Sequence, residues 1–182
     1  WKNYLTYKVF SNDVHNLTVL LGQEAQKSSW EGSQVTKKNF ASNDIPVLSE
    51  GDDVTSRTTD WKDAAAIASY FGRFNYSLKD RYLFTFTMRA DGSSKFGPEN
   101  RWGYFPSAAF AWRIGNEPFM QGLNTDMKLR IGYGEVGNQA IANYLYGSSL
   151  VAINSPFGTA YRLEKISNPK LKWEATKQFN VG

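Results

Sequence analysis

The sequence predicts an all-β chain that forms part of an antiparallel transmembrane β-barrel with long extracellular loops. Three observations support this fold class. Residues 68–114 alternate between apolar and polar side chains, the chain is rich in Tyr, Phe and Trp, and the expected connections between strands alternate between short and long. A two-layer β-sandwich with an apolar interior produces the same alternation, so it stays an alternative at this point.

The central stretch, residues 68–114, predicts three consecutive strands with opposite faces. Side chains on a strand point alternately to its two sides, so every second residue shares a face. One face is apolar and consists of Tyr70, Gly72, Phe74, Tyr76, Leu78, Tyr82, Phe84, Phe86, Met88, Ala90, Tyr104, Pro106, Ala108, Phe110, Trp112 and Ile114. The other face carries Arg, Asp, Asn, Thr and Ser. A barrel turns the apolar face to lipid and the polar face to a wet lumen, whereas a sandwich buries the apolar face.

Composition narrows the class of protein. Of 182 residues, 15% are aromatic, and Tyr and Trp suit the boundary between lipid and water because each has an apolar body and a polar tip. No run of about 18 apolar residues occurs, which excludes a transmembrane helix. Cys is absent, which excludes disulfides and thiolate metal sites. The net charge of +4 is spread along the chain, so no nucleic-acid partner is expected.

Two strands are expected before the central stretch, at residues 1–10 and 15–26, joined by a short turn. Residues 28–62 are polar without a sustained period and predict a long loop, with a helical turn within 40–48. Residues 61–68 predict a short helix or the entry to the next strand.

After the central strands, a connection at residues 115–127 is expected to hold one helical turn at 117–120. A sixth strand follows at residues 128–136, then a long loop at 137–172, and a seventh strand begins at Trp173. The total is about seven strands.

The lengths of the connections favour the barrel over the sandwich. Connections after the first, third and fifth strands are short or moderate, and those after the second, fourth and sixth are longer. In an up-and-down meander these two sets lie at opposite ends, as the periplasmic turns and extracellular loops of outer-membrane barrels do.

Lys177 is an exception to the alternation of apolar and polar faces. It shares a face with Phe179, and a Lys at the bilayer midplane costs roughly 2–4 kcal/mol.

Ordered sequence blocks over residues 69–182 point to a known family. They are Ser69-Tyr70-Phe71-Gly72-Arg73, Arg81-Tyr82-Leu83, Asp91-Gly92-Ser93-Ser94-Lys95-Phe96-Gly97, Asn100-Arg101-Trp102-Gly103-Tyr104-Phe105-Pro106-Ser107, Ala111-Trp112-Arg113-Ile114, Glu117-Pro118-Phe119-Met120, Leu129-Arg130, Tyr133-Gly134, Gly137-Asn138-Gln139, Asn168-Pro169 and Leu171-Lys172-Trp173-Glu174. In this order and spacing they resemble the SusC/RagA family of TonB-dependent outer-membrane transporters. Residues 1–68 match more loosely, chiefly through His15-Asn16-Leu17-Thr18.

The resemblance implies that residues 1–182 are part of the β-barrel domain of a TonB-dependent receptor with about 22 strands, from a bacterium of the Bacteroidetes type. Such transporters are multi-pass proteins of the Gram-negative cell outer membrane. They import glycans or peptides together with a SusD-like surface lipoprotein and draw energy from the TonB complex. The plug domain, the signal sequence, the TonB-contacting segment and the final barrel strand are expected to lie outside this stretch.

Two other functions remain open on the sequence. A secreted carbohydrate-binding β-sandwich would place Phe84, Phe86 and Phe110 in a packed core between two sheets. A passive porin would share the barrel but lack a plug and energy coupling.

The polar face supplies candidate lumen-facing residues, which would contact the plug, line the substrate path, or pair with one another. They are Arg73, Arg89, Asp91, Arg113 and Arg130. Aromatic residues in the long loops are candidate contacts with a ligand or partner. They are Trp30, Trp61, Tyr144, Tyr146, Phe157 and Tyr161. No metal, cofactor or enzymatic activity is expected, because no catalytic or metal-ligand set can be built around His15, the only histidine.

Overall fold

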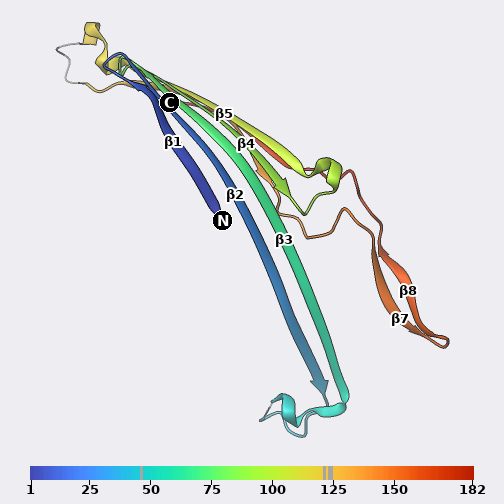
Figure 1. Ribbon diagram of the computed structural model, residues 1–182. Helices are drawn as coiled ribbons and strands as arrows, with labels where there is room; N and C mark the ends of the chain where they lie inside the picture. Colours follow the sequence, from blue (N-terminus) through green and yellow to red (C-terminus); the bar gives the residue numbers. More distant parts are fainter. Residues whose placement is uncertain (46, 121, 123–124) are drawn as a thin grey trace. The chain divides into compact units, whose positions relative to one another are not determined.

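The structure is a computed structural model that describes residues 1–45, 47–120, 122 and 125–182. Within these residues one sheet contains seven strands in the order β1-β2-β3-β4-β5-β6-β9 (Figure 1). Their bounds are β1 Lys2–Ser11, β2 His15–Lys38, β3 Asp52–Leu78, β4 Tyr82–Ser93, β5 Trp102–Arg113, β6 Lys128–Asn138 and β9 Glu174–Val181. Apart from β7 and β8, the strands pair in chain order, as in an up-and-down barrel wall, so the predicted fold class is confirmed. The sheet contains the seven predicted strands, and the described chain has two strands more than predicted.

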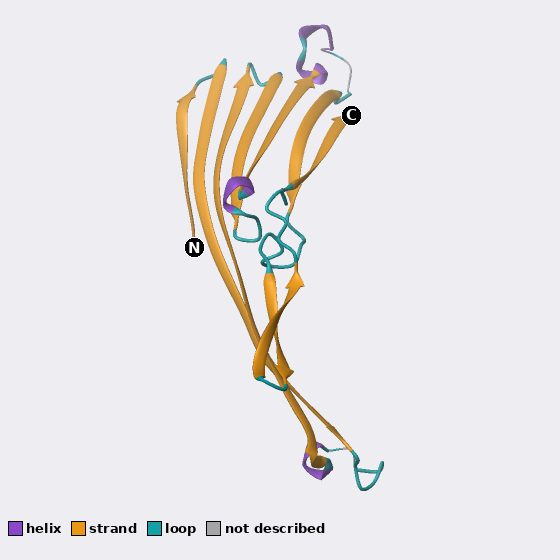
Figure 2. Ribbon diagram, turned by 90° about the vertical axis from the view of Figure 1, so that its right-hand side faces the viewer, coloured by secondary structure: helices purple, strands orange, loops and turns teal. Residues whose placement is uncertain are grey.

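The remaining elements are short. β7 (Ser149–Ser155) and β8 (Gly158–Lys165) form a separate two-stranded hairpin in the connection from β6 to β9 (Figure 2), so the prediction of a loop throughout residues 137–172 is wrong in this part. Four single 3-10 turns occur in the described residues: η1 Leu48–Glu50, η2 Pro98–Asn100, η3 Ile114–Asn116 and η4 Pro118–Met120. The last falls where a helical turn was predicted. None of the helical segments in the described ranges is long and apolar enough to cross a membrane.

The register between strands keeps the two predicted faces intact. Phe86 on β4 lies opposite both Phe74 on β3 and Ala108 on β5, and Ala108 in turn lies opposite Tyr133 on β6. Directly opposed residues in antiparallel strands share a face. The apolar residues of four strands therefore form one continuous surface, which includes the tilted ring pair Phe84–Phe110 with centroids 4.9 Å apart.

This apolar face is not covered by a second layer of protein. Phe84 and Phe86 are each 46% exposed, and the buried hydrophobic side chains in the described part of the chain are only Phe96 and Phe105. A β-sandwich of these strands would bury Phe84 and Phe86 in its core. The sandwich interpretation is therefore wrong, and an extended apolar face of this kind needs a contact other than water.

Stacked aromatic rings lie at both ends of the apolar face. Tyr82 stacks on Trp112 at the end with the short turns, with centroids 6.3 Å apart, and Tyr70 stacks on Trp102 at the other end, at 5.9 Å. Trp102 and Trp112 lie about ten residues apart on β5, which spans about 25 Å along a barrel axis at the usual rise and tilt. That height matches the apolar band of outer-membrane barrels and the aromatic girdles that flank it.

The prediction of a structureless loop at residues 28–62 is wrong. β2 continues to Lys38 and β3 begins at Asp52, so most of this segment, and all of 61–68, is strand. Residues 27–65 form a unit of their own. Its strands lack an apolar period because both of their faces are largely exposed, and period is the signal by which a strand is recognised. The predicted turn within 40–48 includes residue 46, which lies outside the described residues. A 3-10 turn occurs at η1 instead.

The predicted parity of the connections holds only in part. The connections after β2 and β6, residues 39–51 and 139–173, are long, and those after β1 and β3, residues 12–14 and 79–81, are short turns. The β4–β5 connection, residues 94–101, is however shorter than the β5–β6 connection, residues 114–127. The two single-turn helices η3 and η4 occupy that longer segment, whereas the β4–β5 loop is packed against the sheet.

Lys177 lies opposite Glu135 on β6, and its ammonium is 3.4 Å from a carboxylate oxygen of Glu135. The last residue pair between β5 and β6 is Ser107 with Gly134, so this ion pair lies just beyond the part of β6 that pairs with β5. Lys177, the one charged residue noted on the face of Phe179, thus has an acidic partner.

Candidate functional site

The polar face carries a buried ionic cluster near the long-connection end of β3 and β4. The Arg89 guanidinium donates to both carboxylate oxygens of Asp91 at 2.8 Å and to the Ser69 hydroxyl at 2.9 Å. It also lies over the Phe71 ring, 5.7 Å from the centroid. Asp91 and Ser69 are buried and directly opposite each other. Burying Asp91 is tolerated because Arg89 compensates its charge.

The loop between β4 and β5 packs beside this cluster instead of extending into solvent. Phe96 is 0% exposed and lies 4.9 Å from the Trp173 ring, which in turn meets Phe105 edge-on at 5.4 Å. These three rings form the aromatic cluster of the polar face. It joins residues from β5, from the β4–β5 loop and from the position just before β9, so it packs together segments that are far apart in the sequence.

Hydrogen bonds tie the same loop to the long connection after β6. Lys95 Nζ donates to the backbone oxygens of Gln139 and Ile141, at 3.3 and 2.8 Å. Asn100 Nδ2 donates to the Pro169 oxygen at 3.1 Å, and Trp173 Nε1 donates to the backbone oxygen of Arg101 at 3.0 Å. The two connections at this end are therefore held together as one packed assembly.

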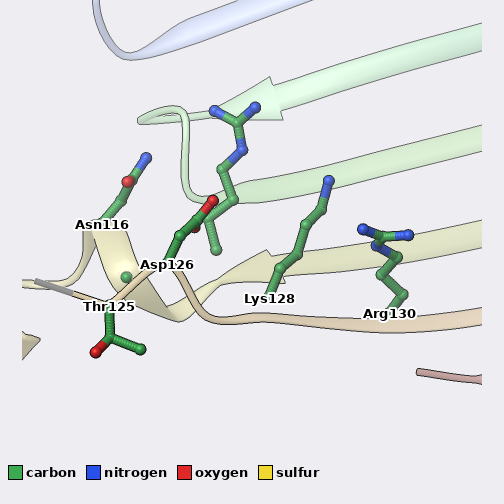
Figure 3. A pocket seen from close by; sticks show the side chains of 7 residues that line it. Asn116, Thr125, Asp126, Lys128 and Arg130 are labelled. Carbon is green, nitrogen blue, oxygen red and sulfur yellow. The ribbon is translucent and has the colours of Figure 1, made fainter.

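At the short-turn end the polar face carries three cationic side chains. Arg113 on β5 lies directly opposite Lys128 on β6, and Arg130 is the next residue on the same face of β6. Arg113 donates to Asp80 Oδ2 at 2.6 Å. These cations line a polar hollow of about 720 Å³, the basic hollow, together with Gly115, Asn116, Thr125 and Asp126. Figure 3 shows Asn116, Asp126, Lys128 and Arg130 directed to the same side.

The β5–β6 connection is fixed by Glu117, a buried carboxylate beside η3 and η4. It accepts hydrogen bonds from the Tyr82 hydroxyl at 2.7 Å, from Trp112 Nε1 at 2.9 Å and from Arg81 at 3.1 Å. The Tyr82 and Trp112 hydrogen bonds, with the neighbouring Arg81 charge, hold the pKa of Glu117 below its ordinary value. Glu117 thereby orients the aromatic pair at this end of the apolar face.

The candidate loop aromatics belong to different elements of the chain. The Trp61 ring occupies the space over Gly32 within residues 27–65, and Trp30, two residues before Gly32, is on the same face of that hairpin. Both are on strands, not in a loop as predicted. Phe157 at the tip of the β7–β8 hairpin and Tyr161 on β8 are fully and largely exposed. Tyr144 is exposed, whereas Tyr146 packs next to Gly97.

Arg73 completes the polar face between the two ends. Its Nε donates to the Thr87 hydroxyl at 3.1 Å, and Thr87 lies directly opposite on β4. Across residues 1–45, 47–120, 122 and 125–182, no group of His, Asp and Glu side chains is arranged to hold a metal ion. The described polar face carries ion pairs such as Arg89–Asp91 and hydrogen bonds such as Arg73–Thr87.

Residues 2–182 match the family model of the TonB dependent receptor-like β-barrel. The chain belongs to this family. The match extends over both the seven-stranded sheet and the β7–β8 hairpin, and it agrees with an uncovered apolar face bounded by aromatic rings.

Named relatives of this receptor barrel identify the subfamily. The chain is 48% identical to the TonB-dependent receptor SusC of Bacteroides thetaiotaomicron over 126 residues, which are 64% of this chain and 13% of SusC. It is 36% identical to the TonB-dependent receptor P3 of Formosa agariphila over 188 residues, 100% of this chain and 19% of P3. The solved structure of the RagAB peptide transporter superposes with a TM-score of 0.84 and 32% identity, covering 99% of this chain and 20% of that one. The SusC/RagA resemblance is thus confirmed, and the chain spans about a fifth or less of these relatives.

Sequence reasoning missed several residues of the receptor barrel's polar face. The structure divides the predicted polar-face residues between two sites. Arg89 and Asp91 form one ion pair, and Arg113 and Arg130 line the basic hollow. Ser69 and Lys128 were not singled out, although each belongs to one of these two sites. Glu117, which fixes the β5–β6 connection, was not singled out as a site residue either. The alternation places Ser69 and Lys128 on the polar face, but their partners depend on the register with neighbouring strands.

Proposed function

We propose that this chain forms part of the wall of a TonB-dependent importer in the outer membrane of a Gram-negative bacterium of the Bacteroidetes type. The uncovered apolar face carries this proposal. A surface that exposes Phe84 and Phe86 and ends in stacked aromatic rings fits a bilayer, with hydrocarbon against the middle and lipid headgroups against Tyr and Trp. The chain would cross the membrane several times, once with each strand of the sheet.

In this arrangement the polar face lines the lumen. Arg73, Arg89, Asp91, Arg113 and Arg130 are then lumenal residues. The short turns at residues 12–14 and 79–81 would face the periplasm, and the long connections the cell exterior. The Arg89–Asp91 cluster and the aromatic cluster above it would shape the outer part of the wall, and the basic hollow would lie near the inner mouth.

The transported solutes would be glycans or peptides, taken up with a SusD-like surface lipoprotein. One named relative is a peptide transporter, and another is SusC. The exposed aromatic side chains of Trp30, Trp61, Phe157 and Tyr161 are suited to stack on a sugar ring or to contact the lipoprotein. The plug domain and the segment that contacts the TonB complex would be supplied by other parts of the protein.

Uptake by cells tests this function. The gene for the complete protein is deleted, and uptake of fluorescent oligosaccharides and oligopeptides is compared with that of the parent strain, with and without an intact TonB complex. We expect at least one class of solute to enter only when both the protein and TonB are present. Entry through the protein without TonB would instead support a passive porin.

The loop aromatics are tested in the same assay. Trp61→Ala and Tyr161→Ala in the complete protein should reduce uptake or lipoprotein co-purification at least several-fold. The reason is that a stacking contact made by one aromatic ring contributes on the order of 1 kcal/mol. Tyr146→Phe, at a ring that packs against Gly97, is the control and should leave both unchanged.

A further inference from the structure

The basic hollow at the short-turn end has an arrangement of charge that the fold alone does not explain. Arg113 and Lys128 are like charges directly opposite each other on neighbouring strands, a pairing that destabilises a sheet unless an anion compensates it. Arg113 has a partner in Asp80. In the described part of the chain, no carboxylate lies within 4.0 Å of the Lys128 ammonium or the Arg130 guanidinium.

These two cations share one face of the same strand. Residues two apart on a strand lie about 7 Å apart, so their charged ends can meet around one small anion. Asn116 lies on the same side of the hollow (Figure 3), and its amide nitrogen, which donates one hydrogen to the Asp80 backbone oxygen at 3.1 Å, has a second hydrogen to donate. Asp126 also lines the hollow and lowers its net positive charge, so the hollow suits a single carboxylate better than a polyanion.

The size of the hollow suits a small molecule. Its volume of about 720 Å³ lies within the range of roughly 300–1,000 Å³ that is usual for ligand sites. The hollow is lined by polar groups, so it offers hydrogen bonds and charge rather than apolar contact. Charge-assisted hydrogen bonds from Lys and Arg to a carboxylate are about twice as strong as neutral ones.

We propose that the basic hollow binds the carboxylate group of a transported solute, with Lys128 and Arg130 as the binding residues. The carboxylate could be the C-terminus of a peptide or the acid group of a uronic sugar, and both offer the same planar oxyanion. This inference rests on the proposed function. It adds that the importer prefers solutes with a carboxylate and holds them near its inner mouth.

Equilibrium binding to the complete protein in detergent tests the site with two matched pairs of probes. Trialanine and trialanine amide differ only in the C-terminal carboxylate, and glucuronate and glucose differ only in the acid group. We expect at least one acid to bind about 10-fold more tightly than its neutral partner at low salt, and the preference to fall as salt is added. The double variant Lys128→Gln with Arg130→Gln should abolish the preference.

Two further variants keep the result interpretable. Lys128→Arg with Arg130→Lys retains both charges and should retain the acid preference. Lys2→Gln with Arg57→Gln makes the same change in net charge at two exposed positions that do not line the hollow, and should also retain the acid preference. If both control variants keep the acid preference, its loss in the Lys128→Gln, Arg130→Gln variant is due to the charges of the hollow and not to misfolding or to net charge.

The proposal is overturned if neither acid is preferred by the unaltered protein, or if the Lys128→Gln, Arg130→Gln variant keeps the preference. It is also overturned if that variant lowers the thermal midpoint of the ligand-free protein and leaves acid binding unchanged. The two cations would then pair with carboxylates of the protein itself. Binding is measured apart from uptake. TonB-independent uptake with an intact acid preference would refute the proposed function and leave the site standing.

Discussion

The ring of Phe105 on β5 fills the space in which a side chain at Gly137 on β6 would begin. The same ring comes within 2.5 Å of the Cβ position of Gly103. Phe105 is one of the two buried hydrophobic residues in the described chain, so the two glycines create the room in which it packs. The contact joins two sequence blocks that lie more than thirty residues apart.

Gly137→Ala should therefore destabilise the complete protein by about 1–3 kcal/mol, because the added methyl group displaces the Phe105 ring. The measurement is the thermal or denaturant midpoint in detergent. Gly132→Ala on the same strand is the control, since the nearest atom to its Cβ position is 3.9 Å away. Equal midpoints for the two variants would show that Phe105 has room to move.

Phe96→Ala should cost about 3–5 kcal/mol, because it removes a fully buried ring that packs on Trp173. The β4–β5 loop should also become open to proteolysis near residues 94–101. Phe157→Ala is the control, because that ring is entirely exposed. Resistance of the Phe96→Ala loop to protease would indicate that Lys95 and Asn100 are enough to hold it.

Glu117→Gln should lower the thermal midpoint at neutral pH by several degrees, because it removes the charge that pairs with Arg81 and accepts from Tyr82 and Trp112. The pKa of Glu117 is lowered in the folded protein, so its stabilising effect is present above the ordinary carboxyl pKa and is lost as pH falls through the lowered value.

The midpoints of the unaltered protein and Glu117→Gln should thus converge as pH falls below about 4. Thermal scans between pH 3 and 8 provide the comparison. Glu99→Gln, at an exposed carboxylate, is the control and should follow the unaltered protein throughout. A constant difference between Glu117→Gln and the unaltered protein would refute the role of the charge.

Glu135→Gln and Lys177→Gln should each lower stability, and the double variant should lower it by less than the sum of the two. The reason is that each single change leaves one member of an ion pair without its partner. A double-mutant cycle on midpoints in detergent measures the coupling. Strictly additive effects would mean that Lys177 is stabilised by something other than Glu135.

Much of the sheet could be predicted from the sequence. Between Tyr70 and Trp112 one face of each strand is almost wholly apolar, so the strands, their faces and the short turns follow from this period. Residues 27–65 could not be predicted in this way. Their strands are exposed on both sides, so no alternation marks them, and the segment resembles a polar loop.

The candidate sites divide in a similar manner. Alternation placed Arg89, Asp91, Arg113 and Arg130 on the polar face, but their partners follow from register. Arg113 meets Asp80 across a turn and stands opposite Lys128, and Arg89 reaches Ser69 on another strand. These contacts span from about 15 to more than 30 residues of sequence, where local pattern carries no information.

The sequence by itself determined that the chain forms strands with one apolar and one polar face, because side-chain direction on a strand depends only on position along it. Only the tertiary structure decided that the apolar face is left uncovered, which separates a barrel wall from a sandwich. It also decided which charges meet, because the pairing of strands, not their composition, sets the distance between side chains on neighbouring strands.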